Sequence, residues 1–434
     1  MQSESENDGR TVKHMGTIID YLKEYGDYTF TEKPMNEVDS LILCQFSYLK
    51  FDGIVPGPGA SASPVTIGYL NEHQDKEKLF ADERYREPNT ALFEGMLNSV
   101  RFSTLRMNSY VNIINVEQEM QFSAITFILE DKTVYIAYRG TDETIIGWKE
   151  DFNLAFSKPV LGQTCSVEYM NTAAEGFSGS FYAGGHSKGG NFAVYAAMNC
   201  RKDVRDRIER IYSHDGPGFR PEIRESGHYE EIADRVVKII PHSSLVGMLL
   251  ESHADGYMVV ESKSFGLLQH DPYTWLVKED GFVQVKDIYK RRKFMDEALN
   301  EWILAMDEEH IHSFVDTLYE VVSASKAATL IDFTADWKKS MLAVVTAVKE
   351  LDGETASMIR KIIGLLFEIT GEHAREELQE RAEEGRIKLE EGRIKLEEGK
   401  QRLEQEWIKR EEKAEQKRRK KKNHTPADVH KERK

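Results

Sequence analysis

The stretch SFYAGGHSKGGNFAVYAAM, residues 180–198, carries the most information about the fold. Residues 180–184 combine small and aromatic side chains, which predicts a short strand, and residues 191–198 suit a buried helix. Between them, residues 185–189 have the pattern G-x-S-x-G, in which a serine occupies a tight strand-to-helix turn. Such a turn would project the hydroxyl of Ser187 beside a helix N-terminus, where it can act as a nucleophile. The alternative interpretation is a glycine-rich turn that opens a helix and has no chemical role.

A second segment, upstream of the serine, supports the catalytic interpretation. Residues 133–138 are rich in β-branched and aromatic side chains and predict a strand, which ends in Arg139, Gly140 and Thr141. A loop at this place can supply one backbone N–H group to an oxyanion hole, and the residue after the nucleophile supplies the other. The oxyanion candidates are therefore Thr141 and Lys188, with the Thr141 hydroxyl as a third donor.

Downstream segments add an acid and a base. A predicted strand over residues 210–214 ends in Asp215, two further strands are predicted over residues 235–241 and 257–261, and His270 follows the last of them. The chain order Ser187, Asp215, His270 is the order of nucleophile, acid and base that goes with this type of serine turn. These three residues are the predicted catalytic triad.

The motifs also carry a family resemblance. The Arg139-Gly140-Thr141 segment, with Trp148 and Asp151 downstream, resembles the Arg-Gly-Thr…Trp…Asp signature of the fungal-type (class 3) lipases. The wider set is similar to a bacterial family of lipase-like α/β-hydrolases that has long been designated a domain of unknown function. The motifs of this wider set are GHSKGGN (185–191), DGPG (215–218), VGML (246–249) and QHDP (269–272). The resemblance spans about residues 15–290 and implies a mostly parallel sheet and an acyl-ester hydrolase with a Ser-His-Asp triad.

One departure from the class 3 pattern leaves the acid open. In those lipases the acid follows the penultimate strand, but here that strand runs into the sequence PHSS, residues 241–244, which has no carboxylate. Asp215, at the end of the preceding strand, is the proposed substitute, and Glu251 and Asp255 are the alternatives. For the base, His253 is the alternative to His270.

The remaining histidines in this part of the chain fit structural roles better. His186 lies inside the serine turn and is expected to pack there or to support the base. His214 adjoins Asp215 and is expected to be a hydrogen-bonded core histidine. No cluster of His, Cys and Asp has the spacing of a zinc site, and there is no phosphate-binding loop pattern, so no metal or cofactor is predicted.

Composition limits the partners and the compartment. A net charge of −16 disfavours general nucleic-acid binding, and 40% hydrophobic residues suffice for a large core. The three cysteines are an odd number at no metal-ligand spacing, which favours reduced thiols. The first residues are acidic and polar, without the apolar segment of a signal peptide, and no run approaches the ~20 apolar residues of a membrane span. We therefore expect a cytoplasmic protein, with export by an unrecognised route as the alternative.

The sequence predicts four segments. Residues 1–14 are expected to be disordered, residues 15–290 to form an α/β-hydrolase domain with extra helices, and residues 291–372 to be helices that pack on this domain or cap it. The fourth segment, residues 373–434, is charged, and it repeats EEGRIKL at 383–389 and 390–396. A glycine in every repeat costs a helix about 1 kcal/mol relative to alanine, so this tail is predicted to be a marginal helix or disordered. An oligomerising coil is the alternative, and the oligomeric state is left open.

Two functions from different classes fit these observations. The first is a serine hydrolase that acts on a small-molecule or lipid ester, with no cofactor. The second is a catalytically inactive hydrolase fold that acts as a binding or scaffold protein with a charged interaction tail. The basic run at 417–422 could add a weak contact with anionic surfaces, while no specific nucleic acid is expected.

Overall fold

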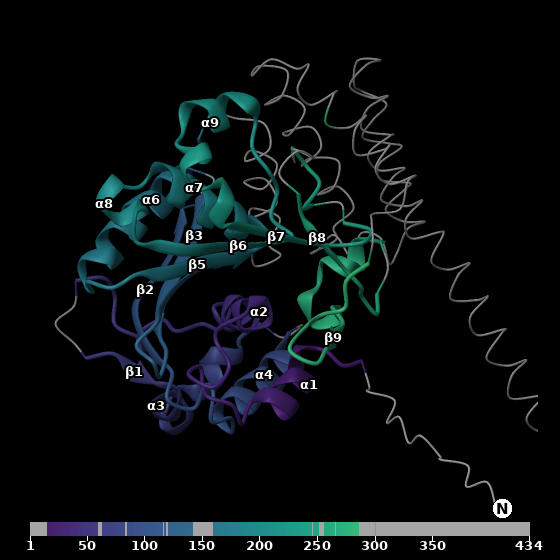
Figure 1. Ribbon diagram of the computed structural model, residues 1–434. Helices are drawn as coiled ribbons and strands as arrows, with labels where there is room; N and C mark the ends of the chain where they lie inside the picture. Colours follow the sequence, from purple (N-terminus) through teal and green to yellow (C-terminus); the bar gives the residue numbers. More distant parts are fainter. Residues whose placement is uncertain are drawn as a thin grey trace, which may run out of the picture. The chain divides into compact units, whose positions relative to one another are not determined.

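The computed structural model (Figure 1) describes the part of the chain that holds most of the predicted site. The described residues are 15–59, 63–82, 85–115, 117–118, 120–141, 159–244, 246–250, 256–264, 266–285 and 300. They belong to one compact unit, Met1–Thr370, and the second unit of the chain is Gly371–Lys434. The predictions for residues 1–14, for the helices of 291–372 and for the charged tail lie outside the described residues.

An eight-stranded sheet forms the middle layer of this unit, with its strands in the order in which they follow one another along the chain. Every neighbouring pair from β1 to β4 is antiparallel, and every neighbouring pair from β4 to β8 is parallel. The strands are β1 (Val65–Thr66), β2 (Arg106–Asn115), β3 (Met120–Ile128), β4 (Val134–Tyr138), β5 (Phe181–His186), β6 (Ile208–His214), β7 (Val236–Pro241) and β8 (Met258–Val260). A separate hairpin follows, β9 (Val277–Lys278) with β10 (Gly281–Phe282).

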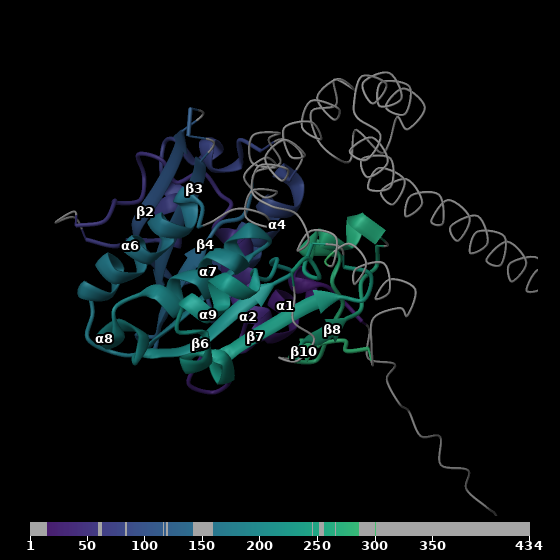
Figure 2. The same cartoon turned by 90° about the horizontal axis from the view of Figure 1, so that it is seen from above.

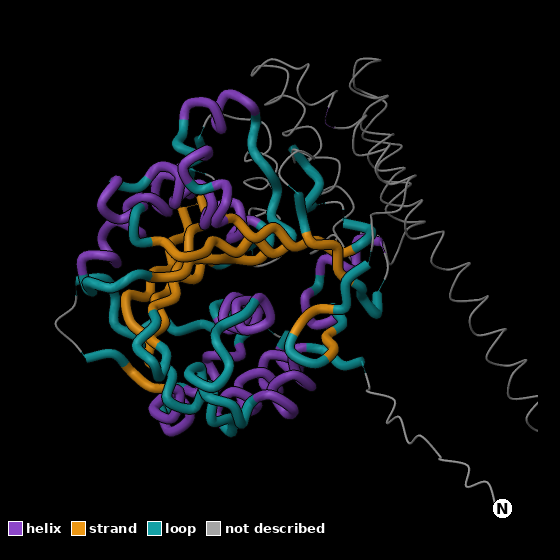
Figure 3. The backbone as a smooth tube through the Cα atoms, viewed as in Figure 1, coloured by secondary structure: helices purple, strands orange, loops and turns teal. Residues whose placement is uncertain are grey.

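Helices cover both faces of the sheet (Figures 1 and 3). On one face lie α1 (Ile18–Tyr25), α2 (Glu37–Phe46), α3 (Ile67–Glu72) and α4 (Arg86–Leu97). On the other lie α6 (Leu161–Glu175), α7 (Lys188–Asn199), α8 (Lys202–Arg205) and α9 (Pro221–Ser226). Short 3₁₀ helices lie at Lys76–Phe80, Tyr229–Glu231, Ala233–Arg235, Gly266–His270 and Pro272–Thr274. Figure 2 looks onto the sheet from the side of α7 and α9, with β2 and β3 at the opposite end from β7 and β8.

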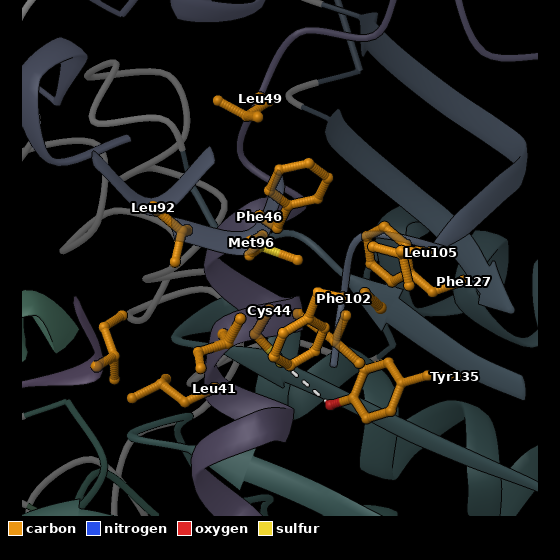
Figure 4. Close-up of a cluster of buried hydrophobic side chains, with 14 of the residues drawn as sticks. Leu41, Cys44, Phe46, Leu49, Leu92, Met96, Phe102, Leu105, Phe127 and Tyr135 are labelled. Atoms are coloured by element: carbon orange, nitrogen blue, oxygen red, sulfur yellow. Dashed lines mark hydrogen bonds between the residues drawn. The ribbon is translucent and has the colours of Figure 1, made fainter. Parts of the chain in front are cut away.

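Two apolar cores follow from this layering. One lies between the sheet and the N-terminal helices, where Leu41 and Phe46 of α2 face Phe127 and Tyr135 of the sheet (Figure 4). The other lies between the sheet and α6 and α7. Each fully buried apolar side chain contributes about 1.5–3 kcal/mol relative to exposure, so the cores hold the strand ends in place on both faces.

A buried ion pair joins the N-terminal helices to one another. Arg101 donates to Asp39 at 2.7 Å from Nε and at 2.5 Å from Nη2, and both side chains are almost fully buried. Tyr21 of α1 donates to the same carboxylate at 3.1 Å. Removing one partner of such a pair leaves an unpaired buried charge, which costs about 3–5 kcal/mol.

Most predicted elements agree with the structure. One predicted segment is divided differently, and two elements of the structure were not predicted. Residues 121–130 and 133–138 are rich in β-branched and aromatic side chains and predict a strand pair, which is confirmed as the antiparallel pair β3 and β4. The charged sequence of residues 70–101 predicts a helical segment, and this segment is divided among the end of α3, a 3₁₀ turn and α4. Strand β2 and helix α6 were not predicted. Among the described residues, no helix is long and apolar enough to cross a membrane.

Candidate active site

Ser187 occupies a strained turn between β5 and α7. Its φ of +58° is in the region that favours glycine, although serine has a side chain there. The turn is tight because glycines flank it: a Cβ on Gly189 would lie 2.1 Å from the carbonyl oxygen of Tyr138, and one on Gly185 would lie 2.2 Å from the carbonyl carbon of Gly189. The strand, turn and helix predicted around the G-x-S-x-G pattern are therefore present.

The loop after β4 passes directly against this turn. A Cβ on Gly140 would lie 3.2 Å from the Cβ of Ser187 and 2.6 Å from the carbonyl oxygen of His186. Thr141 is the next residue of the loop. On the other side, Lys188 is the first residue of α7, and the first N–H groups of a helix have no acceptor within it. The structure thus brings both predicted oxyanion residues to the serine turn.

Asp215 follows β6 and is fully buried, also with a positive φ, of +50°. Its Oδ1 atom accepts a hydrogen bond from the hydroxyl of Ser244 and another from the backbone N–H of Gly247 at 3.1 Å. Its Oδ2 atom accepts from Nδ1 of His270 at 2.6 Å. A buried carboxylate is costly unless it is hydrogen-bonded, and these three donors account for both of its oxygens.

His270 ends the 3₁₀ helix Gly266–His270, and its side chain is one quarter exposed. Because Asp215 takes its Nδ1–H, the neutral ring has its lone pair on Nε2, which points away from the carboxylate. The segment lies close to the serine turn, since Nε2 of His186 is 2.8 Å from the backbone oxygen of His270. The carbonyl oxygen of Ser187 also lies only 2.7 Å from where a Cβ on Gly216 would sit. Ser187 and Asp215 therefore follow the carboxyl ends of the neighbouring strands β5 and β6, and His270 is hydrogen-bonded to Asp215.

The end of β7 has a role that the sequence did not reveal. Its PHSS segment has no carboxylate, but Ser244 donates to Asp215, and His242 accepts from the side chain of Gln269 at 2.9 Å. Gln269 is fully buried, and its backbone oxygen accepts from the indole N–H of Trp275 at 2.7 Å. These contacts hold both the acid and the segment that carries His270. The only signal in the sequence was the QHDP motif itself.

Two other histidines lie at the carboxyl ends of β5 and β6, directly before Ser187 and Asp215. His186 and His214 are paired in register on β5 and β6, and both are buried. Burial lowers the pKa of His214 to about 3, and burial together with the nearby His270 lowers the pKa of His186 well below its usual value. His214 contacts the hydroxyl of Ser40 at 2.8 Å, as expected of a structural core histidine.

Some sequence candidates lie outside the described residues. These are the alternative acids Glu251 and Asp255, the alternative base His253, and the signature residues Trp148 and Asp151. Within the described ranges, no group of three or more His, Cys, Asp and Glu side chains could hold a metal ion. Cys44, Cys165 and Cys200 are free thiols, as predicted.

Comparison with known proteins places the chain in a family. The model of the Mbeg1-like family matches residues 96–320, just over half of the chain, including every residue of the candidate site. The chain belongs to the Mbeg1-like family. This is a lipase-like family, in agreement with the resemblance of the motifs, and no curated protein matches the chain significantly.

Two solved lipase structures are among the similar folds. The Rhizomucor miehei lipase–propeptide complex is 18% identical, with a TM-score of 0.28, over 46% of this chain and 71% of that chain. M37 lipase is 13% identical, with a TM-score of 0.34, over 62% of this chain and 79% of that chain. The mostly parallel central sheet, with the serine turn between β5 and α7, is the arrangement of an α/β-hydrolase fold. Membership of the lipase-like family suggests a lipase-like hydrolase.

Proposed function

We propose that the protein is a serine hydrolase that cleaves ester bonds through an acyl-enzyme intermediate. The observation that carries the proposal is the 2.6 Å hydrogen bond between His270 and Asp215, two residues far apart in sequence, beside a strained serine turn. A buried carboxylate that fixes one nitrogen of a partly exposed imidazole leaves the other nitrogen available to a neighbouring hydroxyl. This arrangement suits general-base activation of Ser187.

The proposed reaction has two halves. In the first, Nε2 of His270 takes the hydroxyl proton as Oγ of Ser187 attacks the ester carbonyl, and it then gives that proton to the departing alcohol. In the second, His270 takes a proton from water, which attacks the acyl-enzyme, and the proton returns to Ser187 as the carboxylic acid leaves. Asp215 holds the imidazole in one tautomer and stabilises the imidazolium in both halves.

The oxyanion of each tetrahedral intermediate needs donors that are already in place. The backbone N–H groups of Thr141 and Lys188 are the proposed donors, because the loop after β4 and the first turn of α7 both adjoin Ser187. Losing one such donor typically lowers kcat by about 10²–10³-fold. The substrate class that follows is a small-molecule or lipid ester, and the proposed chemistry uses no cofactor.

A fluorophosphonate probe tests the proposal directly, because it reacts with activated serines. We expect the wild-type protein to be labelled and Ser187→Ala to lose the label while remaining folded. The molecule offers a matched control, Ser40→Ala, because Ser40 also contacts a histidine but lies in the core. This variant should keep the label.

The same experiment decides the alternative function. A folded wild-type protein that is not labelled, and that does not hydrolyse short soluble esters, would contradict the proposed hydrolase. That result would favour the binding or scaffold protein. Labelling that survives Ser187→Ala would show that another residue is the nucleophile.

A further inference from the structure

His186, the residue before the serine, contacts the base segment in two ways. Its Nε2 atom lies 2.8 Å from the backbone oxygen of His270, and the two ring centroids are 4.6 Å apart, with the ring planes tilted by 37°. Its Nδ1 atom lies 3.2 Å from the hydroxyl of Tyr48. A single buried side chain thus links the serine turn, the segment that ends α2 and the residue that would act as base.

These contacts fix the tautomer of His186. A backbone carbonyl can only accept, so Nε2 must carry the proton that it donates to His270. In the neutral ring Nδ1 then has a lone pair, and the hydroxyl of Tyr48 donates to it. Burial and the neighbouring His270 both lower the pKa of His186, which keeps this ring neutral.

The neutral state of His186 matters because a positive charge would form on the neighbouring ring of His270 during the proposed reaction. His270 becomes an imidazolium when it takes the serine proton, and a second cation at a ring distance of 4.6 Å would oppose that step. A neutral ring allows the charge to form, while the hydrogen bond to the backbone oxygen holds the segment in place. The hydrogen bond that His270 donates to Asp215 orients the His270 ring, and the hydrogen bond that His186 donates to the backbone oxygen of His270 fixes the backbone behind that ring.

We propose that His186 is a positioning residue, which holds the backbone of His270 against the serine turn and offers a neutral face to its ring. The inference rests on the proposed function, because it assigns to His270 the role of base. Without the hydrogen bond from His186, the His270 segment would lose its link to the serine turn. An error of about 1 Å in the position of a catalytic group can cost about 10²-fold in rate.

His214 provides a matched control. It is also buried, also has a lowered pKa, and is paired in register with His186 on the neighbouring strand. Its hydrogen bond goes to Ser40 in the core. Replacing either histidine by leucine therefore removes a buried imidazole from the same level of the sheet, but only one replacement removes a contact with His270.

The first measurement is a proton NMR spectrum, which does not depend on activity. A proton in a short hydrogen bond to a carboxylate resonates far downfield, and the signal of His270 Nδ1–H is identified by its loss in His270→Ala. We expect this signal to shift or broaden in His186→Leu and to persist in His186→Gln, whose amide can still donate. It should also persist in His214→Leu. Equal spectra for His186→Leu and His214→Leu would overturn the proposal, as would the absence of the signal from the wild type.

The second measurement is ester hydrolysis. We expect His186→Leu to lower kcat about 10–100-fold with KM changed less than about twofold, and His186→Gln to recover most of the loss. Tyr48→Phe removes the donor to Nδ1 of His186 and should lower kcat by a smaller factor. This variant replaces His186→Leu as the test if His186→Leu does not fold. Equal kcat losses in the His186 and His214 variants would refute the positioning role. If the wild type neither hydrolyses esters nor reacts with the probe, the proposed hydrolase fails, while the NMR comparison still tests the hydrogen bond.

Discussion

Within the described part of the chain, two regions can be compared in which serine and histidine side chains lie together, and one of these two has the features of an active site. In the core, Ser40 and His214 are in contact at 2.8 Å, and both are completely buried. At the edge of the sheet, Ser187 lies in a strained turn near His270, whose ring is one quarter exposed and bonded to Asp215.

If Ser187 is the nucleophile, as proposed, a serine–histidine contact is not enough to activate a serine. Burial lowers the pKa of His214 to about 3, so its ring is a poor acceptor for a proton, and no described residue is hydrogen-bonded to its Nδ1 atom. His270 has a carboxylate partner that would stabilise the protonated ring. The acid and the solvent-facing edge, more than the serine–histidine contact, separate the proposed site from the core pair.

The largest expected effect is on catalysis. Substitutions at the proposed site should lower kcat, while substitutions of the core pair should change stability. Ser187→Ala and His270→Ala should each lower kcat for ester hydrolysis by about 10⁴–10⁶-fold, and the double variant should be little worse, because the residues act as one unit. Ser40→Ala and His214→Ala should instead change the free energy of unfolding. Kinetics on a soluble ester and urea denaturation of all variants measure this. Site variants whose rate losses simply multiply would contradict a shared mechanism.

The next effect concerns the acid that the core pair lacks. Asp215→Asn should lower kcat by about 10⁴-fold, because an amide cannot hold the imidazole in the required tautomer or stabilise its charge. Labelling by the fluorophosphonate probe should slow in parallel, while circular dichroism shows a folded protein. If Asp215→Asn retains most of its activity, the acid lies elsewhere, and Glu251 and Asp255 become the residues to test.

The sequence predicted which residues lie at this edge of the sheet better than it predicted the elements that support them. The turn around Ser187 was predictable because its glycines are required by close backbone contacts that only glycine tolerates. The order of Asp215 and His270 followed from strand patterns that end in polar residues. Strand β2 was missed because its mixture of asparagine, serine and apolar side chains gives no clear alternation, and its pairing with β3 stabilises it.

Long-range contacts explain what else remained hidden. The sequence showed that the end of β7 lacks a carboxylate, but it could not show that Ser244 donates to Asp215, 29 residues away. Similarly, His186 fitted either packing or support of the base, and only the bond to the backbone of His270 distinguishes them. Contacts of this kind depend on which strands become neighbours, and a single sequence does not give that.

A smaller effect is expected from Ser244, whose hydroxyl donates to the carboxylate of Asp215. The contact between Ser40 and His214 includes no carboxylate. Ser244→Ala removes one of two donors to Oδ1 of Asp215, while the N–H of Gly247 remains. A hydrogen bond to a charged group contributes about 1.5–3 kcal/mol, so we expect kcat to fall about tenfold and unfolding to become easier. Ser244→Thr keeps the hydroxyl and should restore both. If alanine and threonine variants are equally impaired, the effect comes from packing and not from the donor.

The last prediction concerns His214 of the core and the pH dependence of stability, with no expected effect on the proposed catalysis. Because the pKa of His214 is about 3 in the folded protein and its ordinary value is 6.5, only the unfolded chain binds this proton between those pH values. The free energy of unfolding therefore decreases as pH falls from 6.5 towards 3, by about 1.4 kcal/mol per pH unit for this one group. His214→Gln should remove this part of the slope, so its stability approaches that of the wild type at low pH. Urea titrations between pH 4 and 6 measure the two slopes, with Ser40→Ala as a control that keeps the histidine. Parallel curves for wild type and His214→Gln would mean that His214 is protonated in the folded core, and the contrast with His270 would have to rest on the carboxylate alone.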